Sequence, residues 1–126
     1  MREFIRVVVV EPYKKAYIIE KFKNTEENFK SFLGKDYKVK SYFLDDTLFL
    51  CSESSMTPNR AIRDVKGNIS DIICGTFIIV WNCGRGRRSI GTLPKQYAEK
   101  YVKLFKEAEM YRRLPNGKIL MQEVKV

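Results

Sequence analysis

Histidine is absent from the 126 residues of this chain. Its absence removes the usual general base near neutral pH, every serine–histidine or cysteine–histidine nucleophile pair, and the commonest metal ligand. Carboxylates sit next to each other at Asp45-Asp46, where a tight turn explains them, and at Glu26-Glu27, where a helix start explains them. We therefore expect no catalytic residues, no cofactor and no metal site, in a protein that is not an enzyme.

Cysteine and long apolar runs are also scarce. The three cysteines, Cys51, Cys74 and Cys83, are odd in number and contain no CxxC pair, which favours reduced and mostly buried thiols in a cytosolic protein. No apolar stretch approaches the length needed to span a membrane. Residues 4–10 are too short for a signal peptide and are interrupted by Arg6. We expect a cytoplasmic protein without a membrane partner.

Acidic residues are fewer than basic ones, 15 against 24, which leaves a net charge of +9. Residues 85–118 hold much of the surplus, with ten basic and three acidic side chains. Such a surplus indicates either an anionic partner, such as nucleic acid, a nucleotide or an acidic protein surface, or simply lysine-rich solvated faces. The length and the 44% of hydrophobic residues predict a single domain over residues 1–126.

Alternating and β-branched apolar residues predict most of the regular structure. The expected strands cover residues 3–10, 14–22, 37–44, 47–51, 69–81 and 118–126, and the fifth of them is broken or bulged near Gly75. A short helix is expected over 25–33, with Asn24 as its N-cap, Glu27 completing a capping box and Gly34 after its end.

A second, longer helix is expected to begin near Thr92 to Pro94 and to continue through about Met110. Its apolar stripe would consist of Tyr97, Tyr101, Leu104, Phe105 and Ala108. Together these elements predict an α+β fold. The fold would contain a mostly antiparallel sheet of about five to six strands, one short helix near the N-terminus and one long helix near the C-terminus.

The segment 59–64 (NRAIRD) fits either a turn of helix or a short strand. On a helix, Arg60, Arg63 and Asp64 would share one face, where Asp64 would orient Arg60 toward a ligand. The same pair would equally serve as a structural salt bridge that anchors the segment to the sheet.

The basic loop Gly84-Arg85-Gly86-Arg87-Arg88 brings three guanidinium groups within four residues. It lacks the lysine and serine or threonine ending of a P-loop and the glycine order of a dinucleotide site. Arginine forks and glycine-exposed amides suit phosphate, although a solvated loop fits the pattern as well. Phe77 is either a core residue or a stacking platform for a base.

The order of these blocks is specific. Asn59-Arg60-Ala61 and the Asp71-Ile72-Ile73-Cys74-Gly75-Thr76-Phe77 segment stand between Glu11-Pro12 and a helix start near Thr92. This order resembles a family of small proteins of unknown function carried by bacteriophages and other mobile elements. The resemblance covers roughly residues 1–106. The pattern is also similar to Thoeris anti-defence sponge proteins, which sequester cyclic ADP-ribose isomers or cyclic oligonucleotides without cleaving them.

The resemblance implies a non-enzymatic phage anti-defence protein that sequesters a nucleotide signal in the host cytoplasm, as a homo-oligomer. The alternatives are a nucleic-acid-binding regulator and a protein inhibitor, such as an anti-CRISPR, of a host defence enzyme. The expected ligand contacts are Asn59, Arg60, Arg63, Phe77, Arg85, Arg87, Arg88, Arg112 and Arg113.

Overall fold

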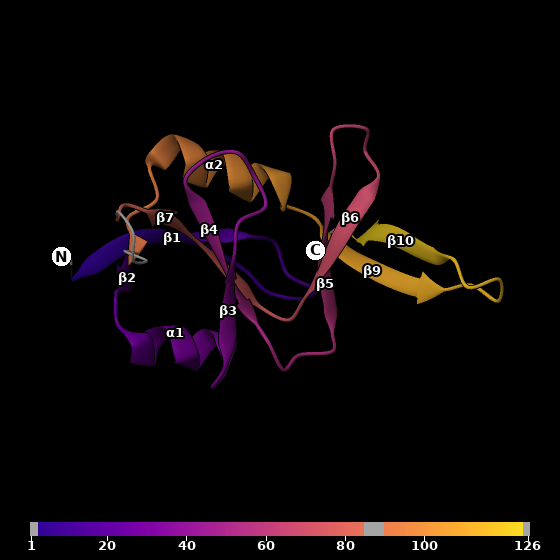
Figure 1. Cartoon of the computed structure of the whole chain (residues 1–126), viewed down its shortest axis with the longest axis horizontal. Helices are drawn as coiled ribbons and strands as arrows, with labels where there is room; N and C mark the ends of the chain where they lie inside the picture. The colour runs from indigo at the N-terminus through magenta and orange to yellow at the C-terminus, as the bar shows by residue number, and fades with distance from the viewer. Residues whose placement is uncertain (1–2, 85–89, 125–126) are drawn as a thin grey trace.

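A six-stranded antiparallel sheet separates two helices in the computed structural model, which describes residues 3–84 and 90–124 without the side chains of Arg113, Ile119 and Val124 (Figure 1). In chain order the elements are β1 (Phe4–Val10), β2 (Tyr17–Lys23), α1 (Glu26–Leu33), β3 (Tyr37–Lys40), β4 (Thr47–Ser52), β5 (Pro58–Arg63), β6 (Ile69–Cys74), β7 (Phe77–Asn82), β8 (Ile90–Gly91), α2 (Lys95–Leu104), β9 (Ala108–Arg113) and β10 (Ile119–Val124). The central sheet has the order β2-β1-β7-β4-β3, and β8 pairs with β7. The predicted α+β class, with a mostly antiparallel sheet and two helices in the described ranges, is confirmed.

Successive side chains of the central strands point to opposite faces of the sheet, so each face has its own core. On one face, Val8, Phe49 and Ile79 pack against Tyr101 of α2 and against Phe105, which follows the end of that helix. On the other face, the apolar side chains of the sheet pack against Phe29 and Leu33 of α1. The sheet residues on that face are Val7, Val9, Leu50, Ile78 and Val80. One helix therefore covers each face of the sheet, as Figure 1 shows.

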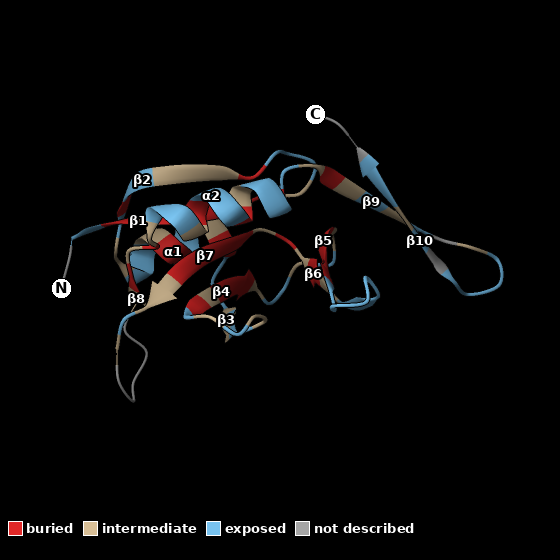
Figure 2. Cartoon of the chain, turned by 90° about the horizontal axis from the view of Figure 1, so that it is seen from above, coloured by how far each residue is buried: buried red, intermediate tan, exposed pale blue. Residues whose placement is uncertain are grey.

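Two hairpins lie together beside the central sheet and its two helices. The strands β5 and β6 form one two-stranded sheet and β9 and β10 form another. The two hairpins meet where the Ala61 amide of β5 donates to Glu109 Oε1 of β9 at 2.7 Å. In Figures 1 and 2 the β9–β10 hairpin extends away from the sheet and from both helices.

The expected start of the first helix is displaced by one residue. Thr25, and not Asn24, is the N-cap, and its hydroxyl accepts a hydrogen bond from the Asn28 amide at 3.1 Å. The predicted capping box with Glu27 is therefore absent, because Asn28 occupies the position that faces the cap. Asn24 instead donates through its side chain to the Ile90 carbonyl.

Residues 69–81 are interrupted at Gly75, where a break or bulge was expected, but the two parts are not one strand of a single sheet. They divide into β6 and β7, which belong to different sheets, and Gly75 lies between them with φ of 75°. A Cβ at this glycine would lie 2.5 Å from Ser55 Cβ, so the backbone crosses between the sheets through a space that only glycine fits. The segment 59–64, ambiguous by its pattern, is mostly strand β5.

The second helix ends at Leu104, well before the expected Met110. Of the expected stripe, Leu104 is 55% exposed and Ala108 begins β9. In a longer helix the Phe105 carbonyl would accept the Glu109 amide. Here Arg60 Nε donates to that carbonyl at 3.1 Å, and residues 108–113 form a strand instead.

Candidate functional site

Three residues expected to contact a ligand lie wholly inside the protein. Asn59, Arg60 and Phe77 are each 0% exposed. Side chains without solvent-facing atoms offer a ligand no surface, which corrects their assignment to the binding site. The structure assigns them to the fold.

Arg60 is an internal cation that joins its own strand β5 to two distant segments. Its guanidinium donates to the carbonyls of Phe105, Lys14 and Asn59, and to Asn59 Oδ1 at 2.7 Å. Asp64 has no part in this network, because its carboxylate accepts the Lys66 and Asn68 amides in a turn. Burial lowers the pKa of Arg60, while the neighbouring charge of Glu109 opposes that shift.

Phe77 is part of the aromatic core beneath α2. Its ring stacks on Phe49 with centroids 5.7 Å apart, and it meets Phe105 edge to face at 5.4 Å. The side-chain amide of Asn59 donates to the carbonyls of Val10 and Gly75, and so holds the crossing between β6 and β7 against β1. Both residues therefore stabilise the scaffold that carries the site.

Two of the remaining expected contacts have described side chains. Arg63 and Arg112 are exposed, and one Arg63 nitrogen donates to the Gly67 carbonyl at 3.1 Å. Arg85, Arg87 and Arg88 lie outside the described residues, as does the side chain of Arg113. Of the nine candidates, Arg63 is the one whose described side chain lines the cavity between α2 and the two hairpins.

This hairpin cavity, of about 280 Å³, lies between the end of α2, the two hairpins and the segment that precedes β4. The buried Ile62 and Phe105 give it an apolar floor, and Phe43 and the half-exposed Leu104 add further apolar lining. Arg63, Glu109 and Glu123 give it a polar rim, and Ala61 completes the lining. An apolar floor with a few convergent polar groups is the usual character of a small-molecule site.

The rim of the hairpin cavity contains one positive and two negative side chains. Glu109 and Glu123 are direct partners across the β9–β10 pairing, a placement at which like charges repel each other. Glu109 Oε1 accepts hydrogen bonds from the Ala61 amide and from the Tyr111 hydroxyl. Burial raises the pKa of Tyr111, the bond to Glu109 adds to that shift, and the charge of Arg63 opposes it.

The acidic part of this rim could not be foreseen from the sequence. Glu109 falls in the stretch expected to be helical, and Glu123 stands in the tail, so their pairing follows only from the β9–β10 register. The expected strand 37–44 includes Phe43, whereas β3 ends at Lys40 and Phe43 lies in the loop between β3 and β4. Cross-strand pairing could have been found only by recognising 108–124 as a hairpin around the Asn116-Gly117 turn.

The described residues contain no group of three or more histidine, cysteine or acidic side chains placed to hold a metal ion. In the same residues, no helix is long and apolar enough to cross a membrane. Cys51 and Cys74 are free thiols, and burial raises the pKa of Cys51 to about 12.

Comparison with known proteins identifies a family. Residues 5–106 match the family model described as a domain of unknown function, DUF3846, and the chain therefore belongs to that family. The match includes α2 and most of the hairpin cavity but stops before β9 and β10. No curated protein and no solved structure matches the chain.

Proposed function

We propose that this DUF3846 protein is a non-enzymatic binding protein for a nucleotide signal, and that the hairpin cavity holds one nucleotide unit of it. The observation that carries the proposal is the position of Arg63, an exposed guanidinium at the rim of a cavity whose floor is apolar. A base fits the apolar floor, and a phosphate fits the arginine fork.

The size of the cavity limits what it receives. A volume of about 280 Å³ is at the small end of ligand sites and suits a single nucleotide unit. A cyclic oligonucleotide would insert one unit and leave its remainder outside. Glu109 and Glu123 supply carboxylate oxygens that accept hydrogen bonds from ribose hydroxyls or a base amino group.

Two further observations support binding without turnover. The chain has no histidine to act as a base near neutral pH. Glu109, one of the two rim carboxylates, already accepts hydrogen bonds from the Ala61 amide and the Tyr111 hydroxyl. The resemblance to anti-defence sponges then suggests the biological role, which is sequestration of a defence signal for a phage or mobile element in the host cytoplasm.

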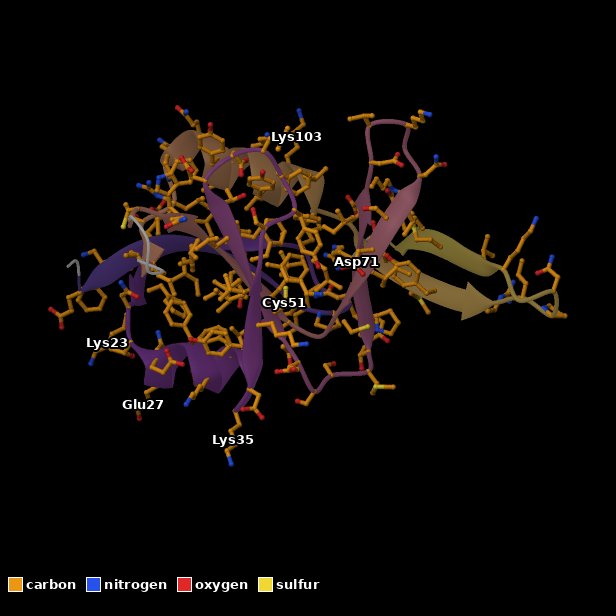
Figure 3. All side chains as sticks on the ribbon, viewed as in Figure 1. Lys23, Glu27, Lys35, Cys51, Asp71 and Lys103 are labelled. Atoms are coloured by element: carbon orange, nitrogen blue, oxygen red, sulfur yellow. The ribbon has the colours of Figure 1, made fainter. Side chains whose placement is uncertain are left out.

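Isothermal titration calorimetry with cyclic ADP-ribose isomers and with cyclic di- and trinucleotides tests the proposal. We expect one of these classes to bind and Arg63→Ala to weaken its binding by about 10- to 100-fold, as loss of a charged hydrogen bond implies. Lys35→Ala removes the same charge from an exposed position on the α1 side of the sheet and should leave affinity unchanged (Figure 3). Equal affinities for the two variants would refute the cavity as the site.

Mass spectrometry of the bound ligand tests the absence of catalysis. After prolonged incubation, heat denaturation of the complex should release the nucleotide with its original mass. A cleaved or ring-opened product that forms with the wild type and not with Arg63→Ala would show that the protein is an enzyme.

A further inference from the structure

The β9–β10 hairpin, called the ribbon below, projects from the rest of the molecule. Its strands pair without a register shift from Ala108↔Val124 to Arg113↔Ile119. The base of the ribbon contacts β5 through Glu109, and its turn is the part farthest from the sheet in both Figures 1 and 2. The ribbon also lies outside the residues that match the family. Its role can therefore differ from that of the hairpin cavity.

The two faces of the ribbon differ in chemistry because side chains alternate along each strand. Glu109, Tyr111 and Glu123 share one face, and both carboxylates line the hairpin cavity. The opposite face, called the outward face, has exposed side chains at its described central positions: Met110, Arg112, Leu120 and Gln122. Leu120 lies directly opposite Arg112, and Gln122 lies directly opposite Met110. The acidic residues of the ribbon are thus both on the other face.

The geometry points to double-stranded DNA as the partner, and we propose that the outward face of the ribbon enters its major groove. A groove about 12 Å wide admits a two-stranded ribbon. Arginine is the commonest reader of guanine, glutamine pairs with adenine, and apolar side chains contact the thymine methyl group. Arg112, Gln122 and the pair Met110 and Leu120 supply these three kinds of contact on one face.

The charge of the ribbon turn supports the same partner. Residues 110–118 contain Arg112, Arg113 and Lys118 and no acidic residue. Lys118 is exposed beside the turn, where it would meet phosphates flanking the groove. The net charge of +9 adds a general attraction to the DNA backbone.

A second copy of this chain fits the outward face less well. In a two-fold dimer the same face meets itself, so Arg112 would lie near its own copy. The acidic residues Glu109 and Glu123 are on the opposite face and would not balance the paired arginines. DNA phosphates and guanine acceptors complement the outward face where a second copy does not.

Fluorescence anisotropy with a labelled DNA duplex of about two helical turns tests the proposal. We expect binding that weakens steeply as salt rises, because each phosphate contact releases counterions. Arg112→Ala should weaken binding by about tenfold. Lys35→Ala, which removes an equal charge far from the ribbon, should change affinity less than twofold. Circular dichroism should show that both variants remain folded, since both side chains are exposed.

Selection of sequences from a random duplex pool separates base reading from simple charge attraction. Gln122→Ala should change the preferred sequence while the salt dependence stays as in the wild type, because glutamine carries no charge. The proposal fails if the wild type does not bind duplex at low salt, if the two charge variants bind equally, or if Gln122→Ala selects the same sequences. It also fails if light scattering shows a dimer that Leu120→Lys dissociates while DNA binding persists unchanged.

The outcome is independent of the nucleotide proposal. Arg63→Ala should retain full duplex binding, because its side chain lines the hairpin cavity and not the outward face. Arg112→Ala should retain nucleotide binding for the converse reason. Failure of either proposal would therefore be recognised without the other.

Discussion

Arg60 shows how a single residue connects the β5–β6 hairpin to the part of the molecule built on the central sheet. Its guanidinium reaches the loop after β1 through Lys14, the end of α2 through Phe105, and its own neighbour Asn59. Glu109 and Glu107 provide nearby negative charge, and Glu107 Oε2 is buried without a hydrogen-bond partner among the described residues. A buried cation is tolerated when it has this set of partners. Without the cation, the same partners would be buried and uncompensated, which destabilises the folded state.

Replacing Arg60 with methionine should therefore destabilise the protein strongly. The variant leaves several buried acceptors unpaired and the acidic neighbours uncompensated, which implies a loss of about 3 to 5 kcal/mol in the free energy of unfolding. Urea unfolding followed by circular dichroism measures this loss. Arg63→Met is the matched control, and because Arg63 is exposed we expect a change within about 0.5 kcal/mol. Similar losses in both variants would contradict the role assigned to Arg60.

The two arginines of NRAIRD also show the limit of sequence reading at this scale. Both are the same residue type in the same short segment, and the pattern favoured either ligand contact or a structural pair for Arg60. The structure gives Arg60 an internal role and Arg63 a place at a cavity rim, because residues 59–62 of β5 are all buried and the strand becomes exposed only at Arg63, after a register shift between Ile62 and Arg63. The segment was open between helix and strand, so this change of exposure could not be foreseen.

At the scale of elements, the step from β6 to β7 depends on Gly75. Its φ of 75° is a conformation that residues with a side chain rarely adopt, and a Cβ there would also meet Ser55 at 2.5 Å. Gly67, in the β5–β6 turn, has a similar φ of 86° but open space around it. Comparing substitutions at Gly67 and Gly75 therefore distinguishes the effect of backbone strain, present at both, from the effect of crowding, present only at Gly75.

We expect Gly67→Ala to destabilise the protein by about 1 kcal/mol through strain alone. Gly75→Ala should lose a further 1 to 3 kcal/mol, roughly, because crowding against Ser55 adds to the same strain. Thermal unfolding by calorimetry gives the two values. Equal losses would mean that Ser55 moves aside freely and that the crossing is not tightly packed.

Element prediction succeeded where local patterning and tertiary structure agree. The β-branched runs of β1 and β7 and the apolar spacing of α1 are explained by burial on one face or both. The prediction failed after Leu104, where a sequence with good helical spacing becomes β9. The cause is distant in the chain, since Arg60 takes the Phe105 carbonyl and Ala61 takes Glu109. Tertiary contacts of this kind override local propensity.

At the scale of the whole molecule, partly buried tyrosine hydroxyls bonded to carboxylates recur in separate regions. Burial, followed by the bond to the carboxylate, raises the pKa of each of four tyrosines. The pairs are Tyr17 with Glu11, Tyr42 with Asp71, Tyr101 with Asp45, and Tyr111 with Glu109. The first pair links β2 to the residue after β1, and the second links the loop before β4 to β6. The third links α2 to that same loop, and the fourth lies within β9. Because these pairs are spread over the molecule, its free energy of unfolding should fall when alkali removes the tyrosine protons.

The Tyr17–Glu11 pair makes this dependence testable at both ends of the pH scale. Burial and Glu11 raise the pKa of Tyr17 from 10.0 to about 12, so its contribution is complete below pH 10 and is lost as pH rises through 12. The Tyr17 hydroxyl in turn lowers the pKa of Glu11 from 4.5, so that contribution is complete above pH 4.5 and is lost as pH falls. Tyr17→Phe removes the tyrosine contribution and the largest cause that lowers the pKa of Glu11, while Lys14 remains beside that carboxylate. Urea unfolding across this range should therefore show a flatter profile at each end than the wild type. Tyr13→Phe changes a 55% exposed tyrosine and should leave the profile unaltered. A wild-type profile that stays level between pH 10 and 12 would contradict the inference. The folded state holds the Tyr17 proton more tightly than the unfolded state does, so the free energy of unfolding must fall as pH rises through that range.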